Sequence, residues 1–241
     1  MTVPVYIVSS HMLGQRSKLD MVADNVANAN TTGYKKLGMS FSEIVSRQKT
    51  QEVASFTHHN GTHYDFSQGG LTRTDNDLDM SITGAGFFAT ERNGQTHYTR
   101  NGKFGLSSEG NLITDTGSPV LDTNGGPINI PADSTKITVT QDGTIANQNG
   151  PLASIGIFNI DEPQKLIRTG SHGYIYNGAE PTLSTTAAIT QGFVENANIN
   201  PIEETVNLTE INRSYTSSSK LVKSLEELQQ NVIRNLSRLP Q

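Results

Sequence analysis

The sequence contains no cysteine, and it has no long uninterrupted hydrophobic run. Without cysteine the chain forms no disulfide, ligates no zinc through sulfur and carries no thiol nucleophile. No apolar stretch reaches the ~18 residues that a membrane-spanning helix needs. The formal net charge of −5 argues against a general nucleic-acid binder. We therefore expect neither a membrane span nor a nucleic-acid partner.

The composition is typical of a turn-rich protein with much exposed surface. Only 34% of the residues are hydrophobic, glycine occurs 22 times, and serine, threonine and asparagine are abundant. The 241 residues are enough to bury a core, in one large domain or two smaller ones. Residues 1–30 and 198–241 are each neutral, so the segment between them carries the whole negative charge. Neutral ends remove net repulsion if copies of these ends pack together.

The first residues, MTVPVYIVSSHMLGQRSK, have no basic leader before the apolar stretch and no small-residue cleavage site. We therefore expect no cleaved Sec-type signal peptide. Export from the cytoplasm would then use another route.

The N-terminal segment repeats apolar residues with alternating spacings of three and four. This spacing is that of a coiled-coil seam and predicts a helix over about residues 4–30, roughly 40 Å long at 1.5 Å per residue. The seam ends at Asn25, Asn28 and Asn30, and the following Thr-Thr-Gly33 is typical of a helix terminus. The positions of the seam are Val5, Val8, Met12, Gln15, Leu19, Val22, Val26 and Ala29.

The C-terminal segment follows the same pattern. Asn200, Pro201 and Glu203 stand at the N-cap, N1 and N3 positions, which predicts a helix start. A second apolar row, at Leu221, Leu228 and Ile233, widens the apolar face and indicates more than one neighbour. The positions of the seam are Leu208, Ile211, Tyr215, Ser218, Val222, Leu225, Gln229, Val232, Leu236 and Leu239.

Two interpretations of these helices stay open. An apolar stripe at helical spacing is most often ordinary core packing. No other segment with a helical period is present to pack on these two, and a two-helix hairpin leaves the second row uncovered. This arrangement favours self-assembly.

The central residues alternate between polar and apolar side chains in short runs. Runs such as DLDMSI, HYTR, NLIT, KITVT and SIGIFNI are separated by Xaa-Gly pairs, which are typical of hairpin turns. The sequence thus predicts an α+β fold: long terminal helices that form a coiled-coil-like α domain, and a central antiparallel β domain. The expected segments are an N-terminal helix in 1–33, a connector in 34–69, the β domain in 70–195 and a C-terminal helix in 196–241.

Motifs that carry chemistry are few. The G-x-G-x-x-A run from Gly84 leads into Phe87-Phe88 and a strand rather than a helix, so we expect packing and not a dinucleotide site. Asp75, Asp77 and Asp79 lack the Gly and Glu of a calcium loop, and the histidines at 58, 59 and 63 lack a partner carboxylate. We predict no catalytic residue, no cofactor and no metal site, and hence no enzyme.

Two other classes of protein stay open on the residues alone. A pair of carboxylates, as in a glycosidase, leaves no sequence motif. An extracellular β-rich hydrolase and a soluble ligand-binding module are therefore the alternatives to a structural protein.

Three stretches resemble one known family in the order in which that family carries them. LDMVADNVANANTTGYK (19–35), the run from GAGFFA through YTRNGKF to EGNLITDTGSPVL (84–121), and QGFVENANINPIEE (191–204) are similar to the signatures of bacterial flagellar rod and hook proteins. The chain length and residues 63–79 most resemble proximal-rod members, and distal-rod members are the runner-up.

The resemblance implies a structural function. Rod proteins stack helically into a hollow drive shaft that crosses the periplasm and transmits torque, with the terminal helices inside and the β domain outside. They leave the cell through the flagellar type III export apparatus without a cleaved signal. The implied partners are that apparatus, other copies of the chain and other rod proteins. The expected assembly interface comprises Val5, Val8, Met12, Leu19, Val22, Asn25, Val26, Asn28, Asn30, Leu208, Ile211, Tyr215, Val222, Leu225, Val232 and Leu236.

Overall fold

The chain folds into two compact units, each built from segments that are distant in the sequence. A computed structural model describes residues 3–47, 53–170 and 173–236. The first unit comprises Met1–Ala27, Leu37–His63 and Asn200–Gln241, and the second comprises Asn28–Lys36 and Tyr64–Ile199. The terminal helices and the antiparallel strands between them confirm the predicted α+β class.

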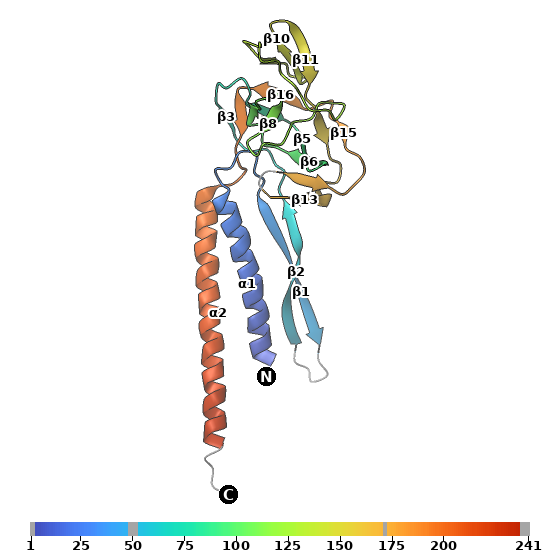
Figure 1. Cartoon of the computed structure of the whole chain (residues 1–241). Coiled ribbons are helices and arrows are strands. Elements are labelled where there is room, and N and C mark those ends of the chain that lie inside the picture. The colour runs from blue at the N-terminus through green and yellow to red at the C-terminus, as the bar shows by residue number, and fades with distance from the viewer. Residues whose placement is uncertain (1–2, 48–52, 171–172, 237–241) are drawn as a thin grey trace. The chain divides into compact units, whose positions relative to one another are not determined.

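The first unit contains both helices and one strand pair. Helix α1 (Val3–Ala27) and helix α2 (Pro201–Leu236) lie side by side (Figure 1). Strands β1 (Leu37–Arg47) and β2 (Val53–Tyr64) pair in a two-stranded sheet, and β1 also contacts α1. Neither helix, within the described residues, is both long and apolar enough to cross a membrane.

Local chemistry sets the helix ends. Helix α1 ends at Ala27, before the predicted residue 30, because the Thr31 N–H turns back to donate to the Asn28 carbonyl at 3.0 Å. Helix α2 begins at Pro201 as predicted. The Asn200 side-chain oxygen accepts a hydrogen bond from the Ile202 N–H at 3.1 Å, which is the expected N-cap.

The second unit is built from short antiparallel strands, as the alternating pattern predicts. Its largest sheet has six strands in the order β13-β14-β6-β5-β12-β15, and smaller sheets pair β9 with β10 and β10 with β11, β16 with β4, β17 with β3, and β7 with β8. The strands are β3 (Leu71–Arg73), β4 (Met80–Thr83), β5 (Phe87–Arg92), β6 (Gln95–Thr99), β7 (Phe104–Leu106), β8 (Leu112–Thr114), β9 (Thr138–Val139), β10 (Thr144–Asn147), β11 (Gly150–Ser154), β12 (Ile157–Asn159), β13 (Leu166–Arg168), β14 (Tyr174–Tyr176), β15 (Thr182–Leu183), β16 (Ala188–Gln191) and β17 (Phe193–Glu195), with a 3₁₀ turn η1 (Pro163–Lys165).

Strands β5 and β6 form a tight hairpin. Asn93 and Gly94 connect them with φ angles of 52° and 75°, the left-handed pair that a type I′ turn requires. The Asn-Gly pair in the sequence therefore marks this turn correctly.

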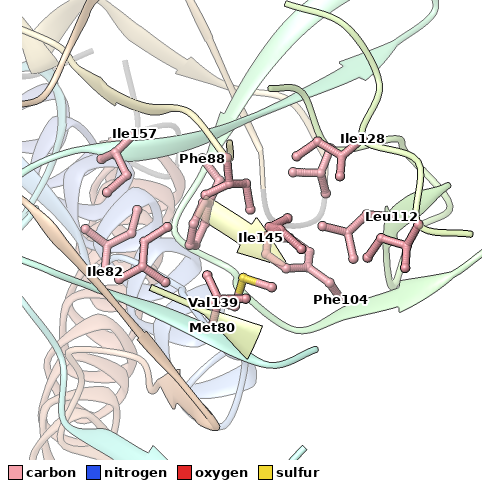
Figure 2. Packing of buried hydrophobic residues seen from close by; sticks show 13 residues of the cluster. Met80, Ile82, Phe88, Phe104, Leu112, Ile128, Val139, Ile145 and Ile157 are labelled. Atoms are coloured by element: carbon pink, nitrogen blue, oxygen red, sulfur yellow. The ribbon is translucent and has the colours of Figure 1, made fainter. Parts of the chain in front are cut away.

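Aliphatic and aromatic side chains fill the interior of the second unit. Met80, Ile82, Phe88 and Ile145 belong to one cluster, which Figure 2 shows from close by. Gly86 has φ of 140°, and a Cβ at this position would lie 2.5 Å from Ile157 Cγ2. The G-x-G-x-x-A run thus brings Phe87 and Phe88 into the core, as predicted.

Candidate assembly interface

One face of helix α2 is sheltered, and it is the predicted seam. Ile211 is buried, and five further seam positions are half-buried among exposed neighbours. The Gln15 amide nitrogen of α1 donates to the Ser214 hydroxyl of α2 at 2.5 Å, so the sheltered side of α2 faces α1. The half-buried seam positions are Leu208, Tyr215, Ser218, Val222 and Leu225.

Outside the seam, α2 exposes apolar side chains to solvent. Ile202 is 75% exposed, Val206 52%, Leu221 51% and Leu228 60%. At 3.6 residues per turn Ile202 and Val206 lie opposite the centre of the seam, whereas Leu221 and Leu228 lie along one flank of it. We call these four positions the outer row. An outer row of this kind along a helix is the type of surface that marks a contact with another protein.

Few apolar side chains of the first unit are buried among the residues whose burial the structure describes. Among the residues whose burial the structure describes, its buried apolar side chains are Val22 and Ile211. The buried clusters of the second unit are much larger. Within that part of the chain, the helices therefore bury less apolar area than the strands of the second unit do.

Asn25 fixes the chain at the end of α1. Its side chain is buried, the amide nitrogen donates to the Leu37 carbonyl at 2.9 Å, and the amide oxygen accepts from the Leu37 N–H at 2.9 Å. Both backbone groups of Leu37, at the start of β1, are thus satisfied by one side chain.

A buried ion cluster holds three segments of the second unit together. Lys35 Nζ lies 2.5 Å from Glu195 Oε1, and Arg100 Nη1 lies 3.2 Å from Glu195 Oε2. The Gly69 N–H also donates to Glu195 Oε1 at 3.0 Å. Burial is the main reason that the pKa values of Lys35 and Arg100 lie below their usual ranges, since the protein interior disfavours their charged forms.

Gly33 brings the chain into contact with this cluster. Its N–H donates to the Glu195 carbonyl at 2.7 Å, and its φ of 69° is in the left-handed region. A Cβ at this position would lie 2.3 Å from the Asn101 backbone nitrogen. Glycine is therefore required here by both the dihedral angle and the space.

Three family models match this chain in sequence order. "Flagella basal body rod protein" matches residues 9–35, "Flagellar hook protein FlgE/F/G D1 domain" matches 81–147, and "Flagellar basal body rod FlgEFG protein C-terminal" matches 190–235. "Flagellar basal-body rod protein FlgF" of Caulobacter vibrioides is 35% identical over 240 residues, which cover 98% of each chain. The chain belongs to the flagellar basal-body rod protein family.

Other relatives are named either FlgF or FlgG. FlgF of Mesorhizobium japonicum is 32% identical over 96% of this chain and 97% of its own length. FlgG of Bacillus subtilis is 29% identical over 97% of this chain and 98% of its own. This rod-family chain is a structural subunit of the flagellar rod, and the rod belongs to the flagellum.

The predicted interface residues of this rod subunit differ in how far their side chains are buried. Val22, Asn25 and Ile211 are buried, and Asn30 is exposed. Val5, Val232 and Leu236 are helical, but their side chains fall outside the described residues. Half-buried positions are Val8, Met12, Leu19, Val26, Asn28, Leu208, Tyr215, Val222 and Leu225. Their role in contacts with other subunits stays a prediction.

The ion cluster of Lys35, Arg100 and Glu195 was not predicted. Each of these residues lies inside a stretch that resembles the family: YK, YTR or FVE. Lys35 and Glu195 are 160 positions apart, and no sequence motif links residues at such a separation. A charged residue next to buried aromatic or aliphatic neighbours is the signal in the sequence that could have marked them.

Proposed function

We propose that this subunit polymerises helically through α1 and α2 and that the resulting shaft transmits torque. The observation that carries this proposal is the outer row, apolar side chains that the described part of the molecule leaves exposed on a helix with little core beneath it. If neighbours cover about 1,000 Å² of apolar surface, the gain is ~25 kcal/mol before ordering costs. Coiled-coil packing of α1 on α2 and of helices between copies is part of the same proposal.

The proposal places the subunit in the proximal rod, within the periplasm. The long matches to two relatives named FlgF support the proximal position, and the matches to FlgG keep the distal rod as the alternative. Export by the flagellar type III apparatus, without cleavage of a signal peptide, belongs to the proposal, as do contacts with other rod proteins. The subunit would act mechanically and catalyse no reaction.

Substitution of Leu225 by aspartate tests the seam. Leu225 is half-buried on the sheltered side of α2, so a carboxylate there would have to be desolvated in the packed helices. We expect Leu225→Asp to abolish swimming and to remove the subunit from purified basal bodies, while the β unit stays folded by circular dichroism. Ser219→Asp, at an exposed position of α2, adds the same charge and should leave swimming intact.

The outcome separates the proposal from its rivals. Normal swimming and normal basal-body content in Leu225→Asp would reject assembly through this seam. A hydrolase or a ligand-binding module would keep its activity after both terminal helices are removed, whereas a rod subunit would lose its function.

A further inference from the structure

The chain passes between the two units four times. These passages follow Ala27, Lys36, His63 and Ile199. In the second unit they lead into three segments: 28–36, 64–69 and 195–199. Any force that the covalent chain carries from the helices to the β strands therefore enters the second unit through these three segments.

Asn198 bonds its own segment to the other two. Its side-chain oxygen accepts a hydrogen bond from the Lys36 N–H at 2.7 Å. Its amide nitrogen is within hydrogen-bond distance of three acceptors: the Asp65 carbonyl at 2.8 Å, the Ser67 carbonyl at 3.2 Å and Ser67 Oγ at 3.0 Å. One half-buried side chain thus joins all three segments.

Lys35 makes a second connection among the same segments. Its side chain is fully buried, and Nζ donates to the Ser67 carbonyl at 2.7 Å and to Glu195 Oε1 at 2.5 Å. The other Glu195 oxygen accepts from Arg100, which directly follows β6, and Arg100 Nη2 donates to the Gly84 carbonyl at 2.7 Å. This series of bonds links the three segments to the largest sheet.

Two backbone hydrogen bonds join the same segments. The Gly33 N–H donates to the Glu195 carbonyl at 2.7 Å, and the Asp65 N–H donates to the Lys36 carbonyl at 2.9 Å. All the residues of this network belong to the second unit. When bonds connect neighbouring segments, a force on one segment is shared with the others. Without such bonds, each segment is pulled away from the core by itself.

We propose that Asn198 and Lys35 form a clamp, which distributes torque from the helices over all four passages of the chain into the β unit. The proposal rests on the proposed function and names the residues that transmit force within one subunit. Bonds that share a force fail at a higher force than bonds that are pulled one after another. The clamp therefore matters when the rod turns against resistance, and assembly at rest does not depend on it.

Asn198→Ala tests the clamp in the full-length chain, because it removes all the side-chain bonds of Asn198. We expect purified basal bodies to contain the variant in the normal amount. Beads attached to the hook should turn at the parent speed when they are small. With large beads or in viscous medium, we expect more motors to stop and more rods to be recovered broken.

Asn196→Ala is the matched control, two positions away and with the same chemical change. Its amide nitrogen donates to Thr72 Oγ1 in β3, outside the three segments, at 2.8 Å. Asn196→Ala should therefore behave like the parent chain at low and at high load.

Lys35→Met separates the response to load from stability. Methionine fills much of the space of the lysine side chain, and Glu195 keeps the Arg100 guanidinium and the Gly69 N–H as partners. One buried cation and one buried carboxylate then remain, so no uncompensated charge is left. We expect the midpoint of urea denaturation to stay close to that of the parent chain, whereas motors should stop at high load as in Asn198→Ala.

The outcomes separate the clamp from a merely structural role. Parent-like rotation of both variants at high load, with both present in basal bodies, would overturn the clamp and leave the proposed function standing. Equal slowing at low and high load would also overturn it. If Asn198→Ala is missing from basal bodies, Lys35→Met decides, and absence of both would assign these residues to folding and contradict the clamp. Absence of the unmodified chain from basal bodies would instead reject the proposed function.

Discussion

Glu195 is a carboxylate shared by two buried cations, Lys35 and Arg100. Glu195→Gln keeps the size of the side chain but leaves both cations without that counter-ion. Removing one partner of a buried ion pair costs roughly 3–5 kcal/mol. We expect a loss of this size in the free energy of unfolding, measured by urea denaturation of the full chain with tyrosine fluorescence.

The surface pair Arg73 and Asp75 provides the matched control. Both side chains are 71% exposed, although Arg73 Nε lies only 2.6 Å from Asp75 Oδ1. Such pairs contribute less than about 1 kcal/mol, so Arg73→Gln should change the free energy of unfolding little. Similar losses in Glu195→Gln and Arg73→Gln would mean that burial does not determine the strength of the cluster.

Asp65 makes the stability of the second unit depend on acid pH. The Ser67 N–H donates to Asp65 Oδ1 at 2.9 Å, and this bond is the main reason that the pKa of the carboxyl lies below its ordinary 3.8. The folded chain then holds this proton less tightly than the unfolded chain does. The contribution is complete above the ordinary pKa and is lost as the pH falls through the folded-state pKa.

Asp65→Asn tests this dependence. We expect an NMR titration to give a carboxyl pKa below 3.8 for Asp65 in the folded protein. The variant should lose stability more slowly than the parent chain between about pH 5 and pH 2. A carboxyl that titrates at or above its ordinary pKa would contradict the assignment.

Residues that act on near neighbours in the sequence could be predicted, and residues that act on distant segments could not. Asn200 caps a helix that begins at the next residue, and Asn93-Gly94 closes a hairpin between adjacent strands. The Lys35 and Glu195 pair depends on the packing of β strands that the sequence does not place. Lys35 and Glu195 come together only in the folded second unit.

The prediction of helices and strands has the same limit: patterns within one segment are recognised, and pairing between segments is not. Both helices follow from an apolar period that exists within each segment, so their existence was predicted closely. Residues 34–69 were predicted as a connector, and they contain β1 and β2. Leu37 and Met39 alternate with small or polar neighbours, as in a strand. The histidines and the glycine of β2 interrupt this alternation. Pairing between the two segments depends on the tertiary fold, so the sequence pattern does not reveal it.

Helix α2 combines two faces with different roles. The seam positions are sheltered on the α1 side, whereas the outer row is exposed. A helix that served a single core would need only the first face. The sequence indicated the second face through Leu221 and Leu228, and the structure adds Ile202 and Val206 to it.

At the scale of the whole chain, the residues of described burial divide the buried apolar area unevenly between the two units. The second unit encloses two hydrophobic clusters, whereas Val22 and Ile211 are the buried apolar side chains of the first unit among residues of described burial. Because burial is the main stabilising term in folding, the terminal helices should open at a lower free energy than the β core.

This difference predicts how an isolated copy behaves. We expect the purified full-length chain to be monomeric, with terminal segments largely disordered, and limited proteolysis to leave a resistant fragment of about residues 35–195. Mass spectrometry of the fragments and amide exchange of the intact chain measure this directly. Protection of both ends in a dilute monomer would count against it. Protection that appears only in the assembled rod would instead show that neighbouring subunits supply the burial that the helices lack.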